Sequence, residues 1–287
     1  MPSPRLSFRS VLIQEHCLTP ASVYDPVSAR IAEEVGFSTG ILAGSVAAHQ
    51  ILAAPDWMLV TLTELAQLVR QITRASTVAL LVDADHGFGN PLNVVRCVEE
   101  LEAAGAQALT IEDTLLPPPY HGSGGETLIS RAEACAKLRA ALQARTQPAT
   151  VIVGRTACLR IEGLEETIAR LQAFEQCGVD ALMVVGLKDL RQLEAIAQST
   201  RLPLLSGPVP PSLDAAQLAA HRVRWRITGH QPYAIALSAL AQAYRDLYQH
   251  GDPAKYTLAQ AGSSDMQRWM RGDYFASLWQ NFMDAPR

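Results

Sequence analysis

Short apolar runs and amphipathic stretches alternate along most of this chain. Residues 77–83 begin with an unbroken apolar run, and residues 91–103 repeat their apolar positions every three or four places. An unbroken apolar run is typical of a strand buried on both faces, whereas spacing of three and four is typical of an amphipathic helix. The pattern therefore predicts a strand followed by a helix.

This strand–helix unit recurs about eight times. Strands are predicted at residues 19–24, 39–43, 77–83, 107–112, 149–154, 180–185, 202–206 and 223–228. Helices are predicted at 1–17, 25–35, 61–73, 91–103, 130–145, 163–176, 189–198, 214–220 and 232–248. Strict alternation implies a parallel sheet, and eight repeats favour a closed (β/α)8 TIM barrel over an open doubly wound sheet.

The chain of 287 residues is predicted to form one domain, with the barrel at about 18–248 and a helical extension at about 253–287. A single helix is expected at residues 264–283. Its many aromatic and methionine side chains make it too apolar for a free tail. We expect it to pack on the barrel or on a neighbouring subunit.

Composition excludes several functional classes. The net charge is only −4, and no cluster of basic and aromatic residues suggests a nucleic-acid partner. No apolar run reaches about 18 residues, so no membrane partner is expected, and no signal peptide is evident. Five cysteines without a Cys-x-x-Cys pair indicate neither a disulfide framework nor a zinc site. A cytoplasmic location is predicted.

Polar residues follow several predicted strands at their C-terminal ends. They are Ser45, Asp83, Asp85, Glu112, Arg155 and His230, and Asp56 lies after the second strand. In a barrel these side chains converge on one mouth. The four carboxylates indicate a site for a hard cation such as Mg²⁺, which prefers oxygen ligands and keeps several waters. The arginine offers a bidentate partner to a substrate carboxylate.

Each residue also has a plainer interpretation. Asp83 could cap the turn that follows it, and Arg155 could be a structural partner of Glu112. Likewise, His230 could cap the next helix, and Ser45 could be an ordinary turn residue. The turn that begins at Gly44 is expected to expose backbone N–H groups that hold an anion.

Several segments together resemble the isocitrate lyase/phosphoenolpyruvate mutase superfamily. They are residues 24–30, 44–46, 83–90 and 111–113. Two further segments, residues 113–117 and 229–233, resemble its oxaloacetate decarboxylase branch. The resemblance runs from about residue 20 to 245. It implies a (β/α)8 barrel whose C-terminal helix is swapped between subunits, usually in a dimer of dimers.

The resemblance also implies a cofactor, a substrate and a set of site residues. The metal would be Mg²⁺, with Mn²⁺ as an alternative, and the substrate a small α-keto dicarboxylate. Asp83 would bind the metal directly, while Asp56, Asp85 and Glu112 would hold metal-bound waters. Ser45 and the adjoining N–H groups, including that of Val46, would hold the substrate carboxylate, Arg155 would neutralise it, and His230 would contact the scissile end.

Two departures from the superfamily bear on the reaction. Its carbon–carbon lyases carry a loop with lysines and a proton-donating cysteine, but residues 116–125 here contain neither. The basic, asparagine-containing loop of phosphonate-handling members is also missing. Decarboxylation needs no such acid to begin, because a metal can stabilise the enolate left by CO₂. The prolines at residues 205–211 differ from the decarboxylase branch.

The sequence thus predicts a carboxy-lyase, a Mg²⁺-dependent decarboxylase that converts oxaloacetate, or a close β-keto acid, to pyruvate and CO₂ through a metal-stabilised enolate. One alternative is a 2-methylisocitrate lyase-like enzyme that splits a substituted malate or citrate, with His121 or Glu126 as the acid. Another is a non-catalytic family member that binds a carboxylate.

Overall fold

The computed structural model describes residues 7–121 and 125–283. It forms two compact units, Met1–Gly229 and His230–Arg287, which are described here one at a time. The predicted single domain, with its boundaries near residues 248 and 253, stays a prediction.

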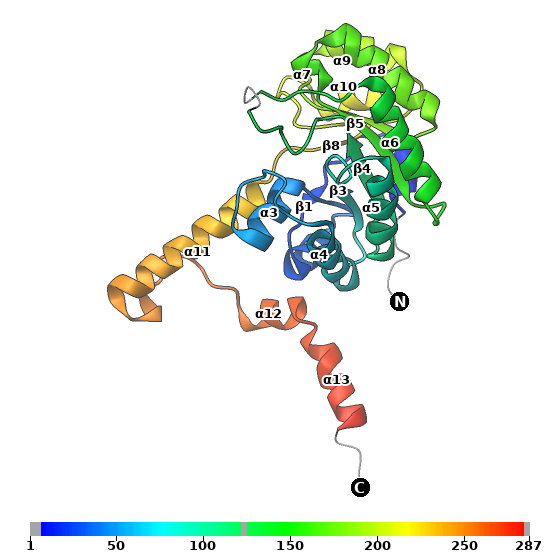
Figure 1. Ribbon diagram of the computed structural model, residues 1–287. Coiled ribbons are helices and arrows are strands. Elements are labelled where there is room, and N and C mark those ends of the chain that lie inside the picture. The colour runs from blue at the N-terminus through cyan, green and yellow to red at the C-terminus, as the bar shows by residue number, and fades with distance from the viewer. Residues whose placement is uncertain (1–6, 122–124, 284–287) are drawn as a thin grey trace. The chain divides into compact units, whose positions relative to one another are not determined.

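The first unit is built on an eight-stranded parallel sheet whose strands follow one another in chain order (Figure 1). The strands are β1 Ala21–Ser22, β2 Thr39–Leu42, β3 Ala79–Asp83, β4 Ala108–Glu112, β5 Val151–Thr156, β6 Ala181–Val184, β7 Leu204–Ser206 and β8 Val223–Arg226. Leu18, just before β1, pairs in parallel with Trp225 of β8. The first and last strands therefore meet, and the predicted (β/α)8 barrel is confirmed.

Helices cover the outside of the sheet. They are α1 Phe8–Leu12, α2 Pro26–Val35, α3 Gly44–Leu52, α4 Leu62–Ala75, α5 Pro91–Ala103, α6 Arg131–Ala144, α7 Cys158–Ile161, α8 Leu164–Cys177, α9 Leu190–Ser199 and α10 Ala215–Ala220. Several begin as their sequences predict: Asp25 and Asn90 each cap a helix whose first residue is proline. Every residue of β2, β4, β6 and β7 is buried, as expected for strands covered on both faces.

Three local predictions need correction. Residues 44–46 begin helix α3 rather than forming a turn, because the small apolar residues that follow continue as a helix. Within the predicted leading helix 1–17, only Phe8–Leu12 is helical among the described residues, and 1–6 lie outside them. The short helix α7 was not predicted, since four residues are too few to show a period.

The second unit consists of helices. They are α11 Gln231–His250, the 3₁₀ turn η1 Pro253–Lys255, α12 Ser263–Trp269 and α13 Gly272–Phe282. The single helix predicted at 264–283 is therefore wrong. Arg271 adopts a left-handed backbone conformation with φ of 56°, which ends α12, and its guanidinium lies 3.9 Å from the centre of the Tyr274 ring.

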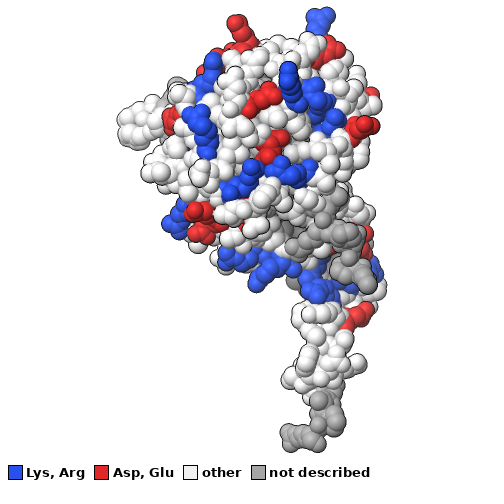
Figure 2. Space-filling model, turned by 90° about the vertical axis from the view of Figure 1, so that its right-hand side faces the viewer, with Lys and Arg blue, Asp and Glu red and all other residues white. Residues whose placement is uncertain are grey.

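No helix in residues 7–121 and 125–283 is both long and apolar enough to cross a bilayer. On the face that Figure 2 displays, acidic and basic side chains are interspersed among uncharged ones.

Candidate active site

Asp83 and Arg155 meet at the C-terminal ends of their strands. Arg155 Nη1 donates to both carboxylate oxygens of Asp83, at 2.6 Å each. The hydroxyl of Thr110 on β4 donates to Asp83 Oδ1 at 2.9 Å. Burial by itself would raise the pKa of Asp83, but these donors and the Asp85 N–H hold it below its ordinary value. Asp83 is therefore a carboxylate already held by several donors.

Glu112 lies beside the same arginine. Glu112 and Arg155 are cross-strand partners on β4 and β5, and Arg155 Nε lies 3.0 Å from Glu112 Oε2. Burial raises the pKa of Glu112, Arg155 opposes that shift, and the charge of Asp83 adds to it. For Arg155, burial would lower the pKa, but Asp83 and Glu112 raise it above its ordinary value. The structural pairing of Arg155 with Glu112, one of the plainer interpretations, is present.

Asp85 completes the cluster without a cation of its own. Among the described residues, no basic side chain lies within ion-pair distance of its carboxylate. Burial, followed by the charges of Asp83, Glu112 and Asp56, raises the pKa of Asp85 well above its ordinary value. Its backbone has φ of 48°, a conformation that residues with a Cβ seldom adopt, and its carbonyl accepts from the Glu112 N–H at 2.8 Å.

The N-terminus of α3 lies next to Asp85. A Cβ on Gly44 would lie 2.7 Å from Asp85 Oδ1, so only glycine leaves room for the carboxylate. Ala43 precedes the helix and provides no side-chain cap, and the first bond within the helix comes from the Ala47 N–H. The N–H groups at Ser45 and Val46 thus belong to the first turn, where backbone donors suit an anion.

Asp56 lies in the exposed connection between α3 and α4. Partial burial raises its pKa, and the charge of Asp83 adds to the shift. Asp56 is therefore within electrostatic reach of the cluster formed by Asp83, Asp85, Glu112 and Arg155, which we call the inner cluster.

Three other residues were predicted from the sequence to take part in the chemistry, namely His230, His121 and Glu126. His230 begins the second unit and stands before α11; its carbonyl accepts from the Tyr233 N–H, but its side chain makes no capping hydrogen bond. His121 is exposed, and Glu126 forms an ion pair with Arg160. The catalytic role of His230 stays a prediction.

Comparisons with known proteins show the family of this chain. The family model described as phosphoenolpyruvate phosphomutase matches residues 8–248. The chain belongs to this family. Solved structures of family relatives superpose closely. One is a phosphonopyruvate hydrolase complex with oxalate and Mg²⁺, at a TM-score of 0.86 and 25% identity, covering 96% of this chain and 98% of that chain. Another is 2,3-dimethylmalate lyase, a member of the PEP mutase/isocitrate lyase superfamily, at a TM-score of 0.83 and 26% identity, covering 95% and 96%.

Curated relatives are more similar still. An oxaloacetate decarboxylase of Rhodopseudomonas palustris (strain BisA53) is 47% identical over 99% of this chain and 98% of its own length. One from Paraburkholderia xenovorans (strain LB400) is 43% identical over 93% and 92%. The predicted superfamily and its oxaloacetate decarboxylase branch are confirmed.

The donor set of this phosphomutase-family chain fits a divalent cation. Three carboxylates surround one guanidinium, and the unpaired Asp85 leaves an excess of negative charge in a buried place. Among the described residues, no three acidic, histidine or cysteine side chains converge closely enough to bind a metal together. Mg²⁺ needs only one or two carboxylates, because it completes its shell with water.

Two buried cations behind the site were not predicted from the sequence. Lys137 of α6 donates from Nζ to the His86 carbonyl at 3.2 Å, and it contributes with burial to lowering the pKa of His86 to about 4. Arg170 of α8 contacts Asp113, which directly follows Glu112. A signal was present, since Arg170 shares the buried helix face of Thr167, Leu171 and Phe174.

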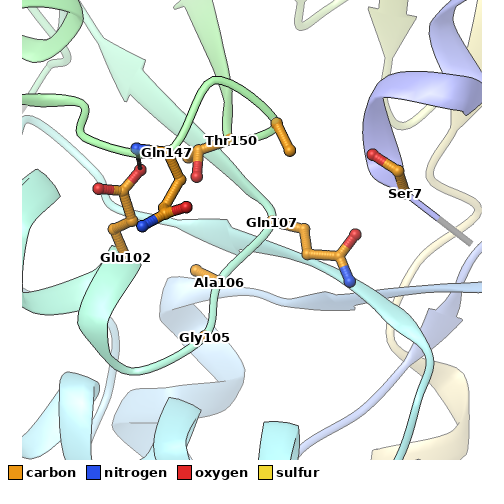
Figure 3. Close-up of a pocket in the computed structure, with 8 residues that line it drawn as sticks. Ser7, Glu102, Gly105, Ala106, Gln107, Gln147 and Thr150 are labelled. Atoms are coloured by element: carbon orange, nitrogen blue, oxygen red, sulfur yellow. Dashed lines mark hydrogen bonds between the residues drawn. The ribbon is translucent and has the colours of Figure 1, made fainter. Parts of the chain in front are cut away.

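A cavity of ≈ 340 Å³ lies at the other end of the barrel. It is lined by residues that precede β4 and β5, including Gln107 and Thr150, and by Glu102 (Figure 3). The Glu102 carboxylate already accepts from the Thr146 and Gln147 N–H groups at 2.9 and 3.0 Å. The one carboxylate among the lining residues that Figure 3 shows is therefore already held by backbone donors, in contrast to Asp85 of the inner cluster.

Proposed function

We propose that this chain is a carboxy-lyase, a Mg²⁺-dependent oxaloacetate decarboxylase that forms pyruvate and CO₂. The observation that carries the proposal is the excess of carboxylates at the strand ends, where Glu112 is buried and Asp83 and Asp85 are half-buried, beside an uncapped helix N-terminus. A cation is needed to balance that charge, and the helix N-terminus suits an anionic α-keto dicarboxylate. The named function of relatives 43–49% identical to this chain supports the same reaction.

Four acidic residues are proposed to hold the metal. Asp83 would bind the metal directly, and Asp56, Asp85 and Glu112 would hold waters of its shell. Bound Mg²⁺, or Mn²⁺, supplies a Lewis acid for the negative charge that develops on the keto oxygen as CO₂ leaves.

Other residues hold and orient the substrate. The Ser45 hydroxyl and the N–H groups of Ser45 and Val46 bind one carboxylate, which fixes the plane of the keto acid. Arg155 neutralises that carboxylate while it remains paired with Glu112. His230 contacts the end that leaves. Water can protonate the carbon from which CO₂ departs, since residues 116–125 contain neither the lysines nor the cysteine that the superfamily's lyases carry in this loop.

The test is a turnover screen of metal-stripped protein with added Mg²⁺. Oxaloacetate should give pyruvate and CO₂ well above the uncatalysed rate, whereas substituted malates and citrates should not be cleaved. Cleavage of a substituted malate, with loss of turnover in His121→Ala, would replace decarboxylation with carbon–carbon bond lysis. Tight dicarboxylate binding without turnover of any substrate would indicate a non-catalytic binder.

We also propose that the protein is a homo-oligomer, a dimer of dimers. The second unit exposes large apolar side chains on each helix, among them Ile235, Tyr244, Phe275, Trp279 and Phe282. Exposed apolar surface of this extent is typical of a subunit interface. Light scattering should give four times the mass of the 31.1 kDa chain, and a monomer would contradict this proposal.

A further inference from the structure

A buried ion pair lies behind the inner cluster. Asp113 has no exposed surface, and its Oδ2 accepts from the Thr156 hydroxyl at 2.8 Å and from Arg170 Nη1 at 3.3 Å. Asp113 directly follows Glu112, and Thr156 directly follows Arg155. Successive strand residues point to opposite faces. Glu112 and Arg155 therefore point toward the mouth, whereas Asp113 and Thr156 point toward the surrounding helices.

The same guanidinium holds a second stretch of chain. Arg170 Nη1 also donates to the Ile129 carbonyl at 3.0 Å, and the Ile129 N–H donates to the Asp113 carbonyl at 2.9 Å. The Leu115 N–H donates to the Thr127 carbonyl at 2.8 Å. Arg170 therefore binds the chain both where it leaves β4 and where it returns to α6.

The rest of the guanidinium lies close to two glutamates, although its Nε makes no hydrogen bond among the described residues. Arg170 Nη2 lies 3.4 Å from Glu162 Oε2, and its Nε lies 3.3 Å from Glu166 Oε1. Glu166 in turn pairs with Arg131 at 2.6 Å. A buried guanidinium needs such compensation for its lost hydration, and its planar fork fixes the directions of its partners. Lysine, with a single charged nitrogen, cannot reproduce that geometry.

We propose that Arg170 is a positioning residue for decarboxylation. By holding Asp113 and the Ile129 carbonyl together, it fixes the end of β4 and therefore the direction in which Glu112 points. Through Asp113 and Thr156 it fixes the end of β5, which carries Arg155. This inference rests on the proposed function, and it names a residue outside the mouth on which the geometry of the mouth depends.

Three variants test it. Arg170→Lys keeps the charge but loses the fork. The double variant Asp113→Asn/Arg170→Met removes both charges, so that neither partner is left buried and unpaired. The matched control is Arg96→Met on α5, where the arginine is exposed and, in the part of the chain that the structure describes, pairs only with Glu100 four residues on.

Hydrogen exchange of the metal-free proteins provides a readout that needs no turnover. The double variant should exchange faster at residues 111–115, 127–130 and 151–156, while exchange at β2 and α2 stays as in the wild type. Turnover of oxaloacetate with Mg²⁺ should fall about 10- to 100-fold, the usual loss when a supporting residue of a metal site is removed. Arg170→Lys should lose less turnover than the double variant, with the same unfolding midpoint as the wild type. Arg96→Met should have the turnover of the wild type.

Faster exchange spread over the whole barrel, or wild-type turnover in the double variant, would overturn the inference. If the wild type itself does not decarboxylate oxaloacetate but exchange changes only at the two strand ends, the proposed function fails. The positioning of those strand ends by Arg170 then stands.

Discussion

Two ion clusters share the ends of β4 and β5, and they differ in charge balance. In the inner cluster, Arg155 pairs with Asp83 and Glu112 while Asp85 has no cation. In the second cluster, which we call the outer cluster, Arg170 pairs with Asp113. The other ion pairs of Arg170 are with Glu162 and Glu166, which water can partly solvate. A buried charge without a partner is costly. The inner cluster is therefore built to receive a cation, and the outer one to hold the chain in place.

Asp83→Asn should have the largest effect on activity. The amide is a poorer metal ligand, and loss of a Lewis acid costs several kcal/mol of transition-state stabilisation, about 1000-fold in kcat/KM. Steady-state pyruvate formation under saturating Mg²⁺ measures this loss. Activity within a few-fold of the wild type would mean that the inner cluster is not the metal site.

Removing each arginine separates the two clusters. Arg155→Met and Arg170→Met each leave buried carboxylates without their partner, which should cost about 3–5 kcal/mol of unfolding free energy. Mg²⁺ should restore stability to Arg155→Met, because a bound cation balances Asp83 and Glu112, but not to Arg170→Met. Urea unfolding with and without Mg²⁺ measures both effects. If Mg²⁺ restored the free energy of unfolding equally in the two variants, the two clusters would not differ in metal binding.

Gly44→Ala should act on the inner cluster alone. Its Cβ would meet Asp85 Oδ1 at 2.7 Å, so the carboxylate must move. Overpacking of this kind costs about 1–3 kcal/mol. The variant should bind Mg²⁺ more weakly in calorimetry, whereas Gly178→Ala, a glycine at the end of α8, should leave that affinity unchanged. Equal Mg²⁺ affinity in Gly44→Ala and the wild type would show that the position of Asp85 does not matter.

Asp85→Asn should have the smallest effect, and in the absence of metal it should stabilise the protein. Because the pKa of Asp85 is raised in the folded protein, its contribution to stability is lost as the pH rises from the unfolded value, about 3.9, through the folded one. Without divalent metal, the neutral amide should therefore make the protein more stable at about pH 8 than the wild type, with little difference near pH 4. Lower stability of Asp85→Asn at every pH would mean that Asp85 is paired after all.

Much of the barrel follows from local pattern. The buried run before Asp83 and the caps at Asp25 and Asn90 mark their elements directly. The start of α3 does not, because Gly44 and Ser45 suit a turn as well as a helix. The break between α12 and α13 was missed for a similar reason, since the apolar residues of 264–283 continue across Arg271 without interruption.

The sequence predicts the site residues that are charged and lie at the ends of neighbouring strands. Asp83, Glu112 and Arg155 stand at strand ends, and the strand order alone brings them together. The partner of Asp113 could not be read in this way, because Arg170 lies 57 positions away on a helix. Only the packing of α8 on the sheet decides which strand residue its guanidinium meets.

Binding of Mn²⁺ to metal-stripped protein, followed by electron paramagnetic resonance, tests whether the inner cluster is a metal site, and it needs no substrate. We expect one bound Mn²⁺ per chain in the wild type and a much weaker site in Asp83→Asn. Equal Mn²⁺ binding by the two proteins, or decarboxylation of oxaloacetate by wild-type protein that binds no metal, would contradict this expectation.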